Sequence, residues 1–99
     1  MEEKEVTMNT PEFIKSYKAR FRIFHSSEDE DIGKQLESSF KIIKTLIGKF
    51  NPDEFSEGTE LVFERVRYVR NESIEFFNDN FQQAILDASL ALGGEMDGD

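Results

Sequence analysis

The chain lacks cysteine and tryptophan, and it contains a single histidine and only two prolines. The absence of cysteine excludes a disulfide framework, a thiol nucleophile and a thiolate metal site. His25 lies next to Ser26 and Ser27, but the neighbouring sequence supplies neither an orienting acid nor an oxyanion hole for a catalytic triad. We therefore expect no enzymatic activity, no cofactor and no metal site.

Long hydrophobic runs and positive charge are also scarce. No apolar segment approaches the ~20 residues that a membrane-spanning helix needs. Twelve lysines and arginines face 21 acidic residues, and the net charge of -9 opposes binding to DNA phosphates or to an anionic membrane. The opening residues 1–5 are acidic and lack the apolar core of a secretory signal. We expect a protein that is made in the cytoplasm and contacts no membrane.

Apolar residues recur at helical spacing through most of the 99 residues. The pattern predicts an all-α fold, a small bundle of three to four helices with a mobile loop before the third. We expect one domain over residues 10–92, with a flexible N-terminus (1–9) and a disordered tail (93–99). A chain of this length buries only ~65% of its unfolded surface, so a partner could complete its core.

The first two helices have clear start and stop signals. Thr10 is the expected N-cap of the first helix, and Pro11 occupies its first position. In the second helix, Ser27 and Glu30 have the spacing of a capping box, and Gly48 is the expected left-handed cap at the end. Its apolar stripe consists of Ile32, Leu36, Phe40, Ile43 and Ile47. Such a stripe predicts a helix with one face in the core.

Four consecutive acids precede the second helix's apolar stripe: Glu28, Asp29, Glu30 and Asp31. They lie where the helix dipole is positive, so capping and solvation explain them better than a metal or catalytic site does. A basic cluster follows in the third helix, formed by Arg65, Arg67 and Arg70. Two interpretations stay open: these arginines pair with the acidic run of an adjacent copy, or they form surface salt bridges with Glu64 and Glu72.

The polar connection between the second and third helices contains one large apolar residue, Phe55. Phe55 either packs against its own domain or anchors a partner. Thr59 is the expected cap of the third helix.

The C-terminal region carries more apolar surface than a small helical core can hide. Asn71 and residues 78–80 are expected breaks, and residues 73–77 suit either a continued helix or a bent connection. A last helix over about 80–92 would end at Gly93 and Gly94. The surplus predicts a docking surface, whose candidate residues are Phe76, Phe77, Phe81, Ile85 and Leu86.

Taken together, these segments resemble the small helical head-tail connector proteins of tailed bacteriophages, also called adaptor or head-completion proteins. The resemblance rests on the following elements: a short first helix over 11–20, the link Phe21-Arg22-Ile23, the acid-rich start over 27–32, the helix end at Ile47-Gly48, and the third-helix segment 65–69.

The resemblance implies a virion protein of the phage neck. Such a protein forms a dodecameric, homo-oligomeric ring beneath the portal protein, extends the DNA channel and receives the next neck protein, a head-closure or stopper protein. DNA would pass through the lumen without specific binding. The candidate docking residues match, by position and hydrophobicity, the segment that engages the portal in this family.

The alternative is an acidic DNA mimic that inhibits a nuclease or a DNA-binding protein. Its support is the net charge of -9. A mimic should spread its acids over an exposed surface, whereas this chain concentrates four at one helix start and interleaves the others with lysines and arginines.

Overall fold

The computed structural model describes the backbone of residues 6–96 and the side chains of residues 6–93. These residues form five α-helices and one 3-10 helix, and no strand occurs among them. The elements are α1 (Pro11–Arg20), α2 (Asp29–Ile47), α3 (Ser56–Arg70), η1 (Ile74–Phe76), α4 (Phe77–Asn80) and α5 (Gln82–Met96). The all-α class is confirmed, and the count exceeds the expected three to four because the C-terminal region divides into η1, α4 and α5.

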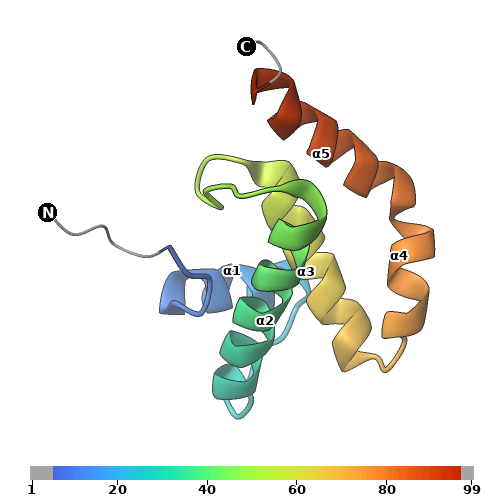
Figure 1. Ribbon diagram of the computed structural model, residues 1–99. Coiled ribbons are helices and arrows are strands. Elements are labelled where there is room, and N and C mark those ends of the chain that lie inside the picture. The colour runs from blue at the N-terminus through green and yellow to red at the C-terminus, as the bar shows by residue number, and fades with distance from the viewer. Residues whose placement is uncertain (1–5, 97–99) are drawn as a thin grey trace, which may run out of the picture.

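Helices α2 and α3 lie side by side and run in opposite directions (Figure 1). Helix α1 packs against α2, while α4 and α5 form a curved arm along the other side of the α2–α3 pair (Figure 1). The core between them contains the stripe expected on α2: Ile32, Leu36, Phe40 and Ile43 are fully buried, and Ile47 nearly so. The arrangement leaves the outer side of α5 without a neighbouring helix among the described residues.

Helix α1 begins as its sequence predicts. The Thr10 hydroxyl accepts a hydrogen bond from the Phe13 backbone N–H at 3.2 Å, and Pro11 follows at the first helical position. On the inner face the Tyr17 ring is buried between Phe21 and Phe63, with centroid distances of 4.8 and 5.6 Å. This aromatic contact joins α1 to α3.

The predicted capping box of α2 does not form. The helix begins at Asp29, and its N-cap Glu28 makes no side-chain capping bond. The Ser27 hydroxyl lies 3.1 Å from His25 Nδ1 instead, and the Glu28 carboxylate pairs with Arg70. Helix α2 does end at Gly48, which has a φ of 113°, although its ψ of 164° is extended rather than left-handed helical.

Helix α3 begins at Ser56, three residues before the expected cap Thr59. Thr59 lies inside the helix, where its hydroxyl donates to the Pro52 carbonyl at 2.7 Å and so fastens the preceding loop. Phe55 packs against its own domain, with its ring 5.8 Å from that of Phe50. The connection after α3 is bent: Asn71 is the C-cap, and η1 and α4 follow.

Both ends of the domain extend beyond the expected boundaries. Met8 is fully buried and its N–H donates to Glu37 Oε1 at 3.0 Å, so the flexible N-terminus expected over 1–9 does not reach Met8. Helix α5 continues through Gly93 and Gly94 to Met96, so the glycine pair does not stop it. Glycine weakens a helix by about 1 kcal/mol per residue but does not forbid it. Residues 1–5 and 97–99, the rest of the expected flexible ends, lie outside the described residues.

Candidate docking site

Helix α5 is apolar on two opposite sides. Its inner side carries Ala88, which is 1% exposed. Leu86 and Leu90 each lie two residues from Ala88, about 200° around the axis at 3.6 residues per turn, and are 51% and 63% exposed. The only charged residue among positions 82–93 is Asp87. No helix of the described residues covers these two leucines, so the outer side of α5 is the candidate docking surface.

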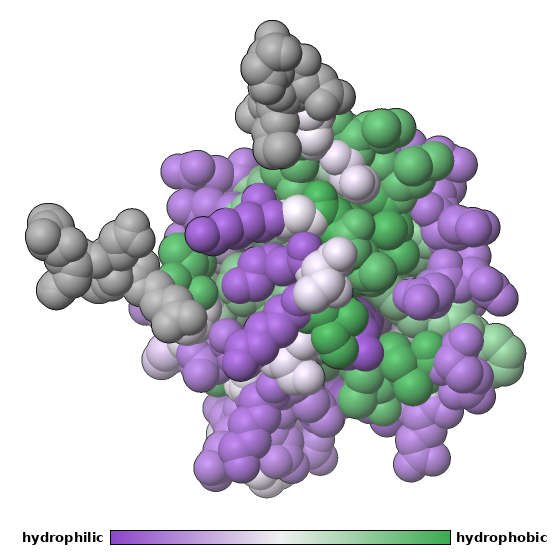
Figure 2. Space-filling model, viewed as in Figure 1, coloured by the Kyte–Doolittle hydropathy of each residue, from purple (hydrophilic) through white to green (hydrophobic). Residues whose placement is uncertain are grey.

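Apolar residues also lie at the surface of the segment before α5. Figure 2 shows hydrophobic residues gathered along the α4–α5 arm, next to predominantly hydrophilic surface over α2. Phe76, at the end of η1, is 55% exposed. We use the name α5 outer face for Leu86 and Leu90. Phe76 is a separate exposed aromatic residue on the same arm.

Of the five docking residues expected from the sequence, three belong to the protein's own core. Phe77 is 1% exposed and stacks on Phe81 with a centroid distance of 4.8 Å. Both rings meet Tyr68 edge to face, at 5.7 and 5.5 Å, and Ile85 packs against the same cluster. Phe76 and Leu86 are the two that remain exposed. Leu90 shares an apolar helix face with Leu86 in the sequence pattern, but it was not among the expected docking residues.

The acidic run and the arginine cluster come together within one chain. Arg70 forms an ion pair with Glu28 and also donates to Gln35 Oε1 at 3.2 Å. The hydrogen bond and positive charge of Arg70 lower the pKa of Glu28. In the same run, Asp29 pairs with Lys18 at 2.6 Å and Glu30 lies 3.9 Å from Lys34, while Asp31 is exposed.

The other two arginines have different surroundings. Arg67 pairs with Glu64 at 2.7 Å, and Arg20 reaches the same carboxylate from α1 at 3.0 Å. Arg65 instead donates to Ser39 Oγ at 3.0 Å, and burial lowers its pKa. The salt-bridge interpretation therefore holds for Glu64, whereas Glu72 forms no ion pair among the described residues.

No group of three or more histidine, aspartate or glutamate side chains within the described part of the chain could hold a metal ion. Between residues 6 and 96, no helix is long and apolar enough to cross a membrane.

The chain matches no protein-family model, and neither a curated protein nor a solved structure is significantly similar to it.

Proposed function

We propose that this protein is a structural component of the neck of a tailed bacteriophage, a connector that forms a ring under the portal, extends the DNA channel and joins the head to the tail. The observation that carries its role in assembly is the α5 outer face, where Leu86 and Leu90 are exposed on a helix with a single charged residue among positions 82–93. The assignment to the phage neck rests on the sequence resemblance.

An apolar helix face is suited to a groove in a larger partner. In this mode of recognition, residues spaced by three or four positions insert as anchors, as the spacing of Leu86 and Leu90 permits. A single helix face supplies less than the ~800 Å² per partner of a standard interface. The portal would therefore have to enclose α5, or contact neighbouring elements such as η1 with Phe76.

The charge of the chain suits a protein that lines a DNA channel. At a net charge of -9, a ring of such subunits would repel the phosphate backbone and would not retain DNA by nonspecific binding. The same charge limits contact with other acidic proteins. Docking through a nearly uncharged helix face avoids this repulsion.

The proposal is tested by co-sedimentation of the purified protein with portal rings from the same genome. We expect a complex that keeps the rotational symmetry of the portal. The double variant Leu86→Ser, Leu90→Ser should lose this binding while its thermal unfolding changes little, because both side chains are more than half exposed.

Helix α2 offers a matched control. Ile42 and Leu46 are also aliphatic, four residues apart and exposed, at 37% and 38%. The variant Ile42→Ser, Leu46→Ser should bind the portal as the unmodified protein does. Equal loss of binding in both double variants would contradict the assignment to the α5 outer face, and a protein that ignores the portal altogether would refute the connector function.

A further inference from the structure

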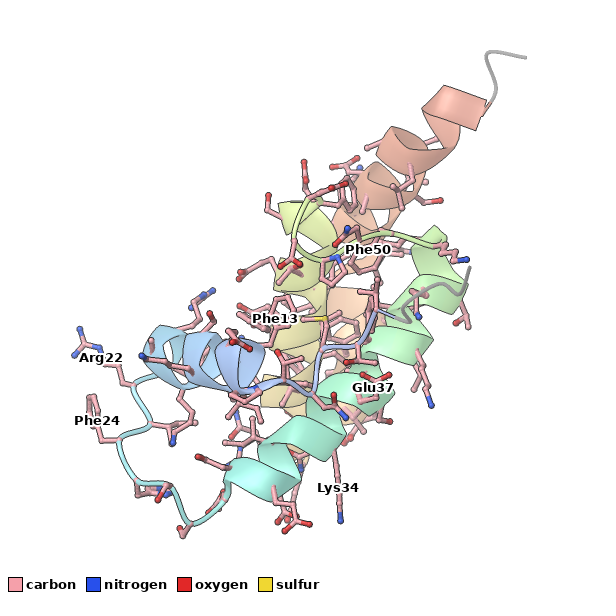
Figure 3. The ribbon with its side chains drawn as sticks, turned by 90° about the vertical axis from the view of Figure 1, so that its left-hand side faces the viewer. Phe13, Arg22, Phe24, Lys34, Glu37 and Phe50 are labelled. Atoms are coloured by element: carbon pink, nitrogen blue, oxygen red, sulfur yellow. The ribbon has the colours of Figure 1, made fainter. Side chains whose placement is uncertain are left out.

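The connection between α1 and α2 presents an aromatic side chain to solvent. Phe24 is 89% exposed, and the flanking residues Arg22 and His25 are also exposed. Figure 3 shows Arg22 and Phe24 projecting away from the helices. The backbone here is held by hydrogen bonds such as Ile23 N–H to the Lys18 carbonyl at 2.9 Å, and Arg22 adopts a positive φ of 61°. The protein therefore maintains a strained, defined loop that exposes an aromatic ring between the guanidinium group of Arg22 and the imidazole of His25.

A groove with the opposite character lies between α3 and α5. Its volume is about 480 Å³. Its apolar lining is formed by Leu61, Phe81, Ala84 and Ala88, and its polar residues are Ser56, Glu57, Glu60 and Asp87. Glu60 already pairs with Arg20 of the same chain at 2.5 Å. Glu57 lies in the first turn of α3, and the carboxylates of Glu57 and Asp87 are exposed.

The exposed loop and the groove lie at different ends of the molecule. Phe24 and the start of α2 occupy one end, and α5 extends toward the other (Figures 1 and 3). Because of this separation, one copy can offer its loop to a second copy and its groove to a third. A contact of this heterologous kind produces rings or filaments, rather than a closed pair.

We propose that Phe24 inserts into the α3–α5 groove of a neighbouring copy, with Arg22 and His25 meeting the carboxylates of Glu57 and Asp87. The aromatic ring would be removed from water by the apolar lining. The charge of Arg22 and hydrogen bonding by His25 would fix its orientation. This contact rests on the proposed function, since it specifies the subunit interface of the ring, but it can be tested on the protein alone.

The absence of cysteine makes disulfide trapping a clean test. The double variant Ser26→Cys, Ser56→Cys places one thiol beside the loop and one at the groove, and keeps all four polar residues of the contact. Oxidised at about 0.15 M salt, where charge repulsion is screened beyond ~8 Å, it should give a ladder of covalent dimers, trimers and larger species. Each single cysteine variant should stop at dimers.

A control thiol is available at Glu12, which is exposed in the first turn of α1, as Ser56 is in α3. Ser26→Cys, Glu12→Cys should give no ladder. Adding Phe24→Ser to the test pair should lower the yield of trimers about tenfold or more, as expected for loss of one buried aromatic contact. Circular dichroism should show an unchanged fold, because Phe24 is almost fully exposed.

The contact is refuted if the ladder is no stronger than that of the Glu12 control, or if it persists with Phe24→Ser. It is also refuted if Ser26→Cys alone dimerises as efficiently as the double variant crosslinks, because a symmetric contact between loops would explain that result. A Phe24-dependent ladder without portal binding would retain the contact and reject the connector function. Portal binding without a ladder would reject the contact and retain the connector function.

Discussion

Replacing Gly58 with alanine should destabilise the protein, although alanine normally favours a helix. Gly58 lies in α3 directly over the Phe50 ring, and an added Cβ would lie 2.6, 2.7 and 2.9 Å from three atoms of that ring. Phe50 is 8% exposed and packs against Phe40 and Phe55, with centroid distances of 5.3 and 5.8 Å. The ring therefore has little room to move away from the new methyl group.

The size of the effect follows from two opposing contributions. Glycine to alanine within a helix gains about 1 kcal/mol, whereas overpacking a tight core costs about 1–3 kcal/mol. For Gly58→Ala we expect a net loss of up to about 2 kcal/mol in the free energy of unfolding. Gly33→Ala is the matched control, because its Cβ would meet the terminal Cδ1 of Ile14 at 3.1 Å, a flexible side-chain end. There the helix gain should dominate, and stability should rise by up to about 1 kcal/mol.

Urea unfolding followed by circular dichroism measures both variants. The midpoints should shift in opposite directions while the slope of the transition stays constant. In a Phe50→Leu background, Gly58→Ala should lower the free energy of unfolding by less than it does in the unmodified protein. The smaller side chain at position 50 makes room for the methyl group. A shift in the same direction for both glycine variants, or no coupling with Phe50, would refute the steric reasoning.

Three other predictions concern the ionic pairs, the end of α5 and the C-terminal aromatic residues. Because Arg70 holds the pKa of Glu28 below its ordinary value of 4.5, the contribution of Glu28 to stability should be complete above pH 4.5 and be lost as pH falls through the lower folded-state pKa. Glu28→Gln should accordingly flatten the acid side of the Tm-pH curve. Gly93→Ala meets nothing within 4 Å, so it should increase helicity measured by circular dichroism and stabilise α5 by up to about 1 kcal/mol; no change would mean that the helix ends earlier. Phe77→Ala should cost about 3–5 kcal/mol in urea unfolding, whereas Phe76→Ala, at a site that is 55% exposed, should cost far less.

The parts of the fold that the sequence predicts well depend on nearby residues. Thr10 caps α1 through an N–H only three positions away, and the apolar stripe of α2 repeats at helical spacing over its whole length. Both signals are contained within a single turn or a single helix. They specify the element wherever it packs, and this is why the all-α class follows from the sequence.

The two helix caps that were predicted wrongly are residues whose hydroxyl groups bind other partners. Ser27 has the spacing of a capping residue, but its hydroxyl meets His25, and Glu28 is drawn to Arg70, which lies 42 positions further along the chain. Thr59 likewise bonds to the carbonyl of Pro52 instead of capping α3. In each case the outcome depends on the path of a loop or on a distant element, neither of which a local pattern contains.

The candidate docking surface shows the same limit more sharply. Phe76 and Phe77 are identical and adjacent, and hydropathy assigns them the same role. The turn from η1 into α4 directs Phe77 toward Tyr68 and leaves Phe76 exposed. The total of apolar surface was therefore predictable from the sequence, but its division between core and exterior depends on the bend between two short helices.

The ion pairs of four carboxylates weigh against the acidic DNA mimic. A mimic needs carboxylates that are available to a basic target and spaced as phosphates are. Here Glu28, Asp29, Glu60 and Glu64 are each paired with a lysine or an arginine of the same chain. To recruit these four to a target, the protein would have to exchange its own ion pairs for new ones, which leaves little net gain at the surface. The uncharged α5 outer face incurs no such exchange, because the only event needed there is the removal of apolar surface from water. The pairing of these carboxylates therefore weighs against the acidic DNA mimic, and the connector remains our proposal.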